Sequence, residues 1–224
     1  DTSVVTQSAD PSAQPTMAPA APQWEFDESE GLAKLWLAAT DLPSPSSLCP
    51  APAITRLSCG VGSARAWDEL VLLNRPVLLE TVTQDKFVAS VLVFQIDGSD
   101  AVVWTDQGLQ WVALADIAEA WTGTYRFFWQ APPGWEGALS LGDSGVSVTQ
   151  VGQMFATFDG MELAEVTEFG PALETRIRLF QEAEGFPIDG AMSQLTLLRL
   201  NERLGVDLTV SRALTRMQNW QDAR

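Results

Sequence analysis

The sequence contains no histidine in its 224 residues. Cysteine and serine peptidases use an imidazole to accept the proton of the nucleophile, so peptidase chemistry of that kind is excluded. A zinc site would have to be built from Cys, Asp and Glu alone, and no closely spaced set of these residues occurs. We therefore expect a protein that is not an enzyme and that needs neither a cofactor nor a metal.

Positive charge is also scarce, with 13 Lys and Arg against 29 Asp and Glu and a net charge of -16. Because phosphate recognition needs clustered basic residues, we expect no nucleic-acid partner, and an anionic membrane surface would repel the chain. No apolar run reaches the roughly 18 residues of a transmembrane helix. The chain begins at Asp1 rather than Met, so any signal or membrane anchor is expected upstream of it.

The only cysteines are Cys49 and Cys59. In an oxidising compartment they would form a disulfide that closes a short loop, with a stabilisation of roughly 2–3 kcal/mol. The alternative is a pair of reduced thiols in a cytosolic core.

The first half of the chain predicts an α+β domain over residues 25–133, preceded by an Ala/Pro/Ser-rich flexible linker over residues 1–24. Apolar spacing predicts helices over 29–39 and 64–73 and a helical turn over 115–121. Alternating or β-branched runs predict an antiparallel sheet, with strands over 77–83, 87–96, 101–104, 110–112 and 125–130.

The hydrophobic period changes after Pro132 and Pro133. Residues 136–205 are expected to form a separate small domain, a bundle of three helices over 146–158, 171–184 and 193–204. Residues 206–224 are expected to be a C-terminal tail, which either forms one more amphipathic helix or frays.

The second domain resembles the three-helix peptidoglycan-binding domain of bacterial cell-wall hydrolases. The resemblance rests on Gly142-Asp143-Ser144-Gly145, Phe180-Gln181, Asp189-Gly190 and Thr196-Leu197. It departs at Ser193-Gln194, where the family usually has Gly-Pro. The resemblance implies peptidoglycan as the ligand, and the candidate contact residues are Asp143, Arg176, Phe180, Gln181, Asp189 and Thr196. The alternative is that Asp143 and the glycines form helix caps and turns, and that Arg176 and Gln181 belong to a solvated face.

The upstream part is similar to the periplasmic half of general secretion pathway protein A, the ExeA-like component of type II secretion. The matching segments are Trp67-Asp68-Glu69-Leu70, Asn74-Arg75-Pro76, Trp104-Thr105-Asp106 and Phe128-Trp129. The resemblance implies a degenerate, papain-like cysteine-peptidase domain before the wall-binding module. Phe87-Val88-Ala89 stands where the catalytic histidine would be expected, and Asp106 where the third member would be.

From this resemblance we expect a non-catalytic periplasmic protein, tethered to the inner membrane by an upstream segment, that helps the secretin assemble through the cell wall. The implied partners are peptidoglycan, the type II secretion B protein and, indirectly, the secretin; a homo-oligomer is allowed. One competing hypothesis is a protein–protein adaptor of the cell envelope that does not bind the wall. Another is a wall hydrolase using carboxylates such as Glu162, Glu165 and Glu168, although a solvated acidic face is the simpler interpretation.

Among the tryptophans, Trp67, Trp104 and Trp121 are expected in the core. Trp135, in the turn between the two domains, is expected at a surface or an interface.

Overall fold

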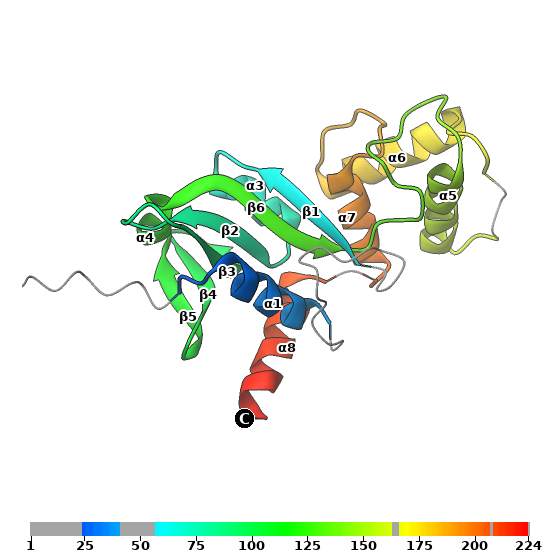
Figure 1. The fold of residues 1–224 in the computed structure, drawn as a ribbon. Coiled ribbons are helices and arrows are strands. Elements are labelled where there is room, and N and C mark those ends of the chain that lie inside the picture. The colour runs from blue at the N-terminus through cyan, green and yellow to red at the C-terminus, as the bar shows by residue number, and fades with distance from the viewer. Residues whose placement is uncertain (1–23, 41–56, 163–165, 207, 224) are drawn as a thin grey trace, which may run out of the picture.

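The structure is a computed structural model that describes residues 24–40, 57–162, 166–206 and 208–223 (Figure 1). A six-stranded antiparallel sheet with the order β1-β6-β2-β3-β4-β5 forms one region, and three of the helices form a second region beside it. The predicted α+β fold, an antiparallel sheet followed by a helical part, is confirmed. The strands are β1 (Ser58–Ser63), β2 (Val77–Val82), β3 (Val88–Asp97), β4 (Asp100–Thr105), β5 (Gly108–Ala113) and β6 (Trp121–Trp129).

Strand β1 lies at a sheet edge and was not predicted from the sequence. Its sequence, Ser-Cys-Gly-Val-Gly-Ser, is poor in the β-branched and aromatic residues that favour strands. It forms because β6 offers a long aromatic partner, with Cys59 opposite Phe128 and Gly60 opposite Phe127. A Cβ on Gly60 would lie 2.4 Å from the ring of Phe127, so only glycine leaves room for this ring against the edge strand.

Each face of the sheet carries its own core. One face carries Leu78, Leu92 and Phe94 and is covered by α1 (Glu28–Ala39) and α8 (Val210–Asp222). The other face carries Leu79, Val91 and Val103 and packs with α3 (Trp67–Leu73) and α4 (Leu114–Ala118). The alternation of neighbouring residues between the two cores is the period of two expected of a strand buried on both faces.

The predicted core tryptophans lie in or against these cores. Trp104 is 4% exposed, and Trp67 stacks on Trp121 with ring centroids 4.5 Å apart, both half-buried. Trp135 packs edge-on against Trp129 of the sheet, with centroids 6.0 Å apart, at the point where the chain leaves the sheet.

The second region consists of α5 (Val146–Asp159), α6 (Pro171–Glu184) and α7 (Gln194–Arg203), close to the three predicted helices. Their apolar faces meet around Val151, Phe155, Ile177, Phe180 and Leu197, all at most 3% exposed. Gly185 ends α6 in the left-handed conformation with φ 70°, which glycine adopts without strain. We call residues 139–204 the helical module.

Residues 206–224, predicted as a tail, contain α8, which does not pack in the helical module. It lies beside α1 on the sheet, where Ala213 and Met217 are fully buried and Trp220 contacts Trp104 with centroids 5.4 Å apart. The part built on the sheet is therefore made from both ends of the described chain, and we call it the sheet region: residues 24–40, 57–130 and 208–223. No helix in the described ranges is long and apolar enough to cross a membrane.

Polar contacts join the two regions. Glu202 of α7 accepts a hydrogen bond from Asn74 Nδ2 at 3.2 Å and pairs with Arg75 Nη2 at 3.6 Å. Asn201 Nδ2 donates to the carbonyl of Gln130, and Gln130 Nε2 donates to the carbonyl of Val206 at 2.7 Å. The last bond places the segment entering the helical module beside the segment leaving it.

Candidate ligand-binding site of the helical module

Gln181 is the centre of a buried hydrogen-bond network. The residue is 2% exposed, and its Nε2 donates to Asp189 Oδ1 at 2.7 Å and to the carbonyl of Ala191 at 3.0 Å. Its Oε1 accepts from the backbone N–H of Gly190 at 2.9 Å. Every hydrogen-bonding atom of the side chain is thus used to hold the loop that joins α6 to α7, and Gln181 does not lie on a solvated face.

The loop held by Gln181 has little freedom. Asp189 Oδ1 also accepts from the backbone N–H of Ala191 at 2.9 Å. These hydrogen bonds, that from Gln181 above all, hold the pKa of Asp189 below its ordinary value. Gly190 has φ 77°, and a Cβ there would lie 2.8 Å from Arg178 Nε, so the Asp-Gly pair of the motif is required by the turn itself.

Ser193 stands where the peptidoglycan-binding family usually has glycine, and it has a clear role here. It is the N-cap of α7, accepting from the backbone N–H of Thr196 at 3.2 Å, while the two hydroxyl oxygens lie 2.9 Å apart. Thr196 is 2% exposed. The departure from the family pattern therefore leaves the last turn capped.

Phe180 and Arg176 belong to an aromatic cluster at the other side of α6. Phe180 is 2% exposed and meets Phe155 and Phe158 edge-on, each with centroids 5.6 Å apart. The guanidinium of Arg176 lies over the ring of Phe155 at 5.0 Å and binds both carboxylate oxygens of Asp159, at 2.7 and 2.5 Å. These hydrogen bonds lower the pKa of Asp159.

Asp143 was expected to cap the helix that follows it, and it does not. Helix α5 begins after Gly145, which makes no side-chain cap, whereas Asp143 Oδ2 accepts from the backbone N–H of Ser140 at 2.7 Å. Asp143 closes the turn that precedes the helix. Its backbone carbonyl accepts from the N–H of Phe169 at 2.7 Å, which ties this turn to the start of α6.

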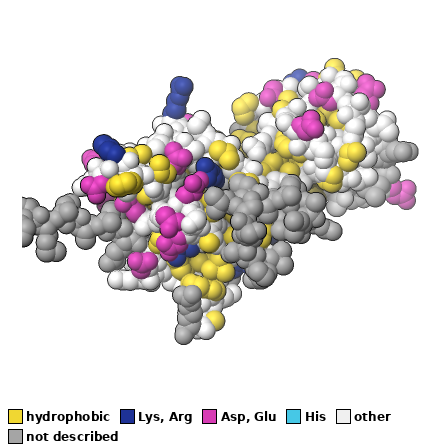
Figure 2. Space-filling model, viewed as in Figure 1, with side chains coloured by type: hydrophobic (Ala, Val, Ile, Leu, Met, Phe, Trp, Pro, Cys, Tyr) yellow, Lys and Arg dark blue, Asp and Glu magenta, His cyan; other side chains and the backbone are white. Residues whose placement is uncertain are grey.

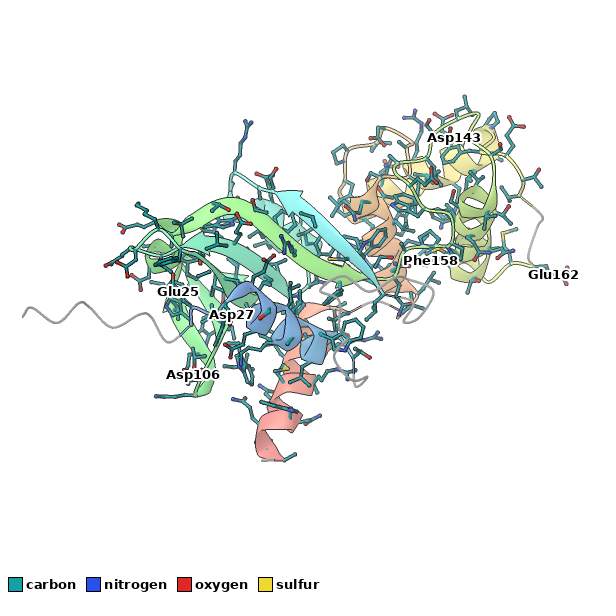
Figure 3. The ribbon with its side chains drawn as sticks, in the orientation of Figure 1. Glu25, Asp27, Asp106, Asp143, Phe158 and Glu162 are labelled. Atoms are coloured by element: carbon teal, nitrogen blue, oxygen red, sulfur yellow. The ribbon has the colours of Figure 1, made fainter. Side chains whose placement is uncertain are left out.

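The six candidate residues thus lie in two clusters and one separate turn, which contains Asp143. Gln181, Asp189 and Thr196 come together in one network, and Phe180 and Arg176 lie in the aromatic cluster. Phe180, Gln181 and Thr196 are buried, so Asp143, Asp189 and the partly exposed Arg176 are the ones that a ligand can reach directly. Figure 3 labels Asp143 and Phe158 on the helical module, and Asp106 at the tip of the β4–β5 hairpin.

Asp159 and Glu184 were not among the candidate residues, yet they neutralise the arginines of the site. Every arginine of the helical module forms an ion pair: Arg176 with Asp159, Arg178 with Glu174, Arg199 with Glu184 and Glu202, and Arg203 with Glu184. On the face drawn in Figure 2, acidic side chains outnumber basic ones over both regions. A ligand therefore meets a surface with uncompensated negative charge, which suits neutral or amine-bearing groups.

The carboxylates considered for hydrolysis do not share a helical face. Helix α5 ends at Asp159, so Glu162 lies beyond it and is exposed, and Glu168 forms an isolated bridge with Ser144. Glu165 lies outside the described residues. Cys49 also lies outside them, so the disulfide predicted between Cys49 and Cys59 stays a prediction. In the described part of the chain no three His, Cys, Asp or Glu side chains gather as a metal site would require.

The positions compared with a peptidase triad lie at one end of the sheet. Phe87, just before β3, is 71% exposed, and Asp106, just after β4, is also exposed. The pairing of β3 with β4 places both at the same end, because Val93 lies opposite Val103. An exposed phenylalanine there offers an apolar contact but cannot accept a proton.

Comparison with known proteins shows the fold. No protein-family model matches the sequence, and no curated protein sequence matches it. The structure is similar to the crystal structure of a periplasmic domain of the EpsAB fusion protein of the Vibrio vulnificus type II secretion system. The two are 24% identical with a TM-score of 0.57, and the match covers 89% of this chain and 88% of that one. The shared fold thus includes both the sheet region and the helical module.

Proposed function

We propose that this chain is a non-catalytic, periplasmic wall-binding part of a type II secretion assembly protein, and that it helps the secretin to assemble through the cell wall. The observation that carries the proposal is the fold shared, over both regions, with the periplasmic domain of the Vibrio vulnificus type II secretion protein. The peptidoglycan-binding resemblance of the helical module supports the choice of ligand. The absence of histidine from the sequence supports a role without peptidase activity.

The helical module is suited to binding rather than chemistry. Its motif residues form a rigid, fully hydrogen-bonded frame around Gln181, which pre-organises the surface that carries Asp189. Its arginines are neutralised by carboxylates, so it offers no free cation to polarise a scissile bond.

The proposal is tested by co-sedimentation of the chain with purified sacculi. The decisive variant replaces residues 131–205 with about four glycines, which the contact between Gln130 and Val206 makes feasible. We expect the intact chain in the pellet and the excised chain, shown to be folded by near-UV circular dichroism, in the supernatant. An intact chain that stays in the supernatant would refute wall binding.

A matched pair of arginines tests the site itself. Arg176 and Arg203 both bind one carboxylate through Nε and Nη2, but only Arg176 is a candidate contact residue. Arg176→Gln should lower the bound fraction several-fold and Arg203→Gln should leave it unchanged. Equal loss in both variants would count against Arg176 as a contact residue.

The competing hydrolase and adaptor hypotheses have their own readouts. Release of dye from labelled peptidoglycan by the intact chain would support hydrolysis, and we expect none. Binding of a purified partner that survives excision of residues 131–205 would place the docking surface on the sheet region.

A further inference from the structure

An open groove of about 540 Å³ lies at the end of the sheet, between α3 and α8. Its floor includes Val93, Phe94, Gln95 and Ile96, four consecutive residues of β3. The pairing of β3 with β4 shifts register between Val93 and Gln95, so the alternation of side chains is interrupted here and consecutive residues can line one groove.

The edge of β3 is open there because its neighbour is shorter. Strand β2 begins at Val77, opposite Val93, so β3 continues past it through Gln95 and Ile96. A two-residue turn joins Asp97 to Asp100, and a turn of this length makes Asp97 and Asp100 a hydrogen-bonded pair.

Hydrogen-bonded and non-hydrogen-bonded pairs alternate along antiparallel strands, so Ile96 and Ala101, the next pair along, form no hydrogen bonds with each other. The N–H and C=O of Ile96 therefore point away from β4, toward the groove. No backbone hydrogen bond from another described segment reaches them.

The lining of the groove contrasts with the net charge of the chain. The chain carries a net charge of -16, yet none of the described residues lining the groove is Asp or Glu. Its walls are apolar or neutral: Leu70 and Val71 of α3, Asn74 just after α3, and Ser211, Leu214, Thr215 and Gln218 of α8. Arg75, the one charged lining residue, is 2% exposed and pairs with Glu202.

We propose that this groove binds an extended, uncharged segment of a partner protein, which adds as a short strand beside Ile96, in line with β2. The open strand edge selects an extended backbone, because only such a backbone presents N–H and C=O groups at the right spacing. The absence of lining carboxylates removes the desolvation cost that an apolar segment would meet elsewhere on this acidic surface. The inference is independent of wall binding, since the groove lies wholly in the sheet region.

The test begins with selection of random seven-residue peptides displayed on phage against the 224-residue chain. We expect enrichment of uncharged, β-branched sequences. The selected peptide is then synthesised, and its binding to variants is measured by fluorescence anisotropy. No enrichment, or enrichment of Lys- and Arg-rich peptides, would overturn the proposal.

Helix α3 supplies a matched pair of variants. Val71 and Leu72 are 49% and 47% exposed, but only Val71 lines the groove. Val71→Glu should weaken peptide binding at least tenfold, whereas Leu72→Glu should change it less than twofold. Gln218→Glu, on the opposite wall, should reproduce the effect of Val71→Glu, with Asn219→Asp as its control.

Backbone pairing has a separate readout. Binding of the peptide should slow hydrogen exchange at the Ile96 amide, and N-methylation of alternate peptide residues should abolish binding. Equal binding by the Val71→Glu and Leu72→Glu variants, or an Ile96 amide that exchanges equally fast with and without peptide, would overturn the proposal.

Discussion

The helical module is built from consecutive residues, whereas the sheet region is completed by a helix from the far end of the chain. In the module, α5, α6 and α7 follow one another and their caps and turns come from neighbouring residues such as Gly185 and Ser193. In the sheet region, α1 and α8 share one face although the whole module separates them in sequence. The first region is therefore specified locally, and the second depends on long-range packing.

The largest expected effect comes from removing α8. Deletion of residues 206–224 exposes the apolar surface under Ala213, Met217 and Trp220. Loss of a large buried side chain alone costs about 2–5 kcal/mol, so the deletion should approach the full stability of the sheet region. We expect loss of the near-UV signal of Trp104 and its neighbours while the module's helices persist in far-UV circular dichroism. Independent folding of the truncated sheet region would break the comparison.

A second prediction concerns the contact between the regions. Glu202→Gln removes the charge that faces Arg75, whose side chain is fully buried, and weakens the bonds from Asn74 and Arg199. We expect a loss of about 2–4 kcal/mol in urea denaturation, because a buried charge is left poorly compensated. Glu182→Gln, on the exposed face of α6, is the control and should change stability by less than about 0.5 kcal/mol.

A third prediction sharpens the local character of the module. Gln181→Leu leaves the N–H of Gly190 without its acceptor and releases Asp189. The expected loss is about 2–3 kcal/mol, the cost of an unsatisfied buried group, and only the helical signal should melt earlier. Gln150→Leu, which removes a pair with Gln153 on α5, is the matched control. Equal destabilisation of the sheet region by Gln181→Leu would show that the two regions melt as one.

The smallest predicted effect is a pH dependence. The pKa values of Asp159 and Asp189 are lowered in the folded state, by hydrogen bonds from Arg176 and Gln181 respectively. A lowered pKa adds stability above the unfolded value, near pH 4, and this stability is lost as pH falls through the folded value. Acid should therefore weaken the module's helical signal below about pH 4. Asp189→Asn should flatten this dependence, whereas Asp106→Asn should leave it unchanged.

The sequence predicts the helices well and their partners poorly. Apolar spacing places α1, α5, α6 and α7 within a few residues of their observed bounds, because each buries a stripe with a period of 3.6. The same spacing would have shown that Gln181 is buried, since it lies four residues after Ile177 and eight after Leu173 on the inner face of α6. Because glutamine is polar, the position of Gln181 on the buried face was not recognised from the sequence.

Contacts between segments that are far apart in the chain have no comparable pattern in the sequence. Nothing near Ser58–Ser63 reveals that β6 will pair with it, and nothing in Val210–Asp222 shows that its apolar face meets α1 rather than the adjacent module. For the same reason Asp159, a partner for Arg176 from 17 residues away, was not foreseen. Pairings of this kind follow from the three-dimensional packing alone.

The position of α8 sets an order of events in time. A chain that emerges from the amino end completes the helical module as soon as Leu204 is available, whereas the sheet region must wait for Met217. Until then the apolar surface beside α1, which α8 will cover, stays exposed. The nascent chain therefore acquires a finished helical module before the sheet region is closed, and docking of α8 completes that closure.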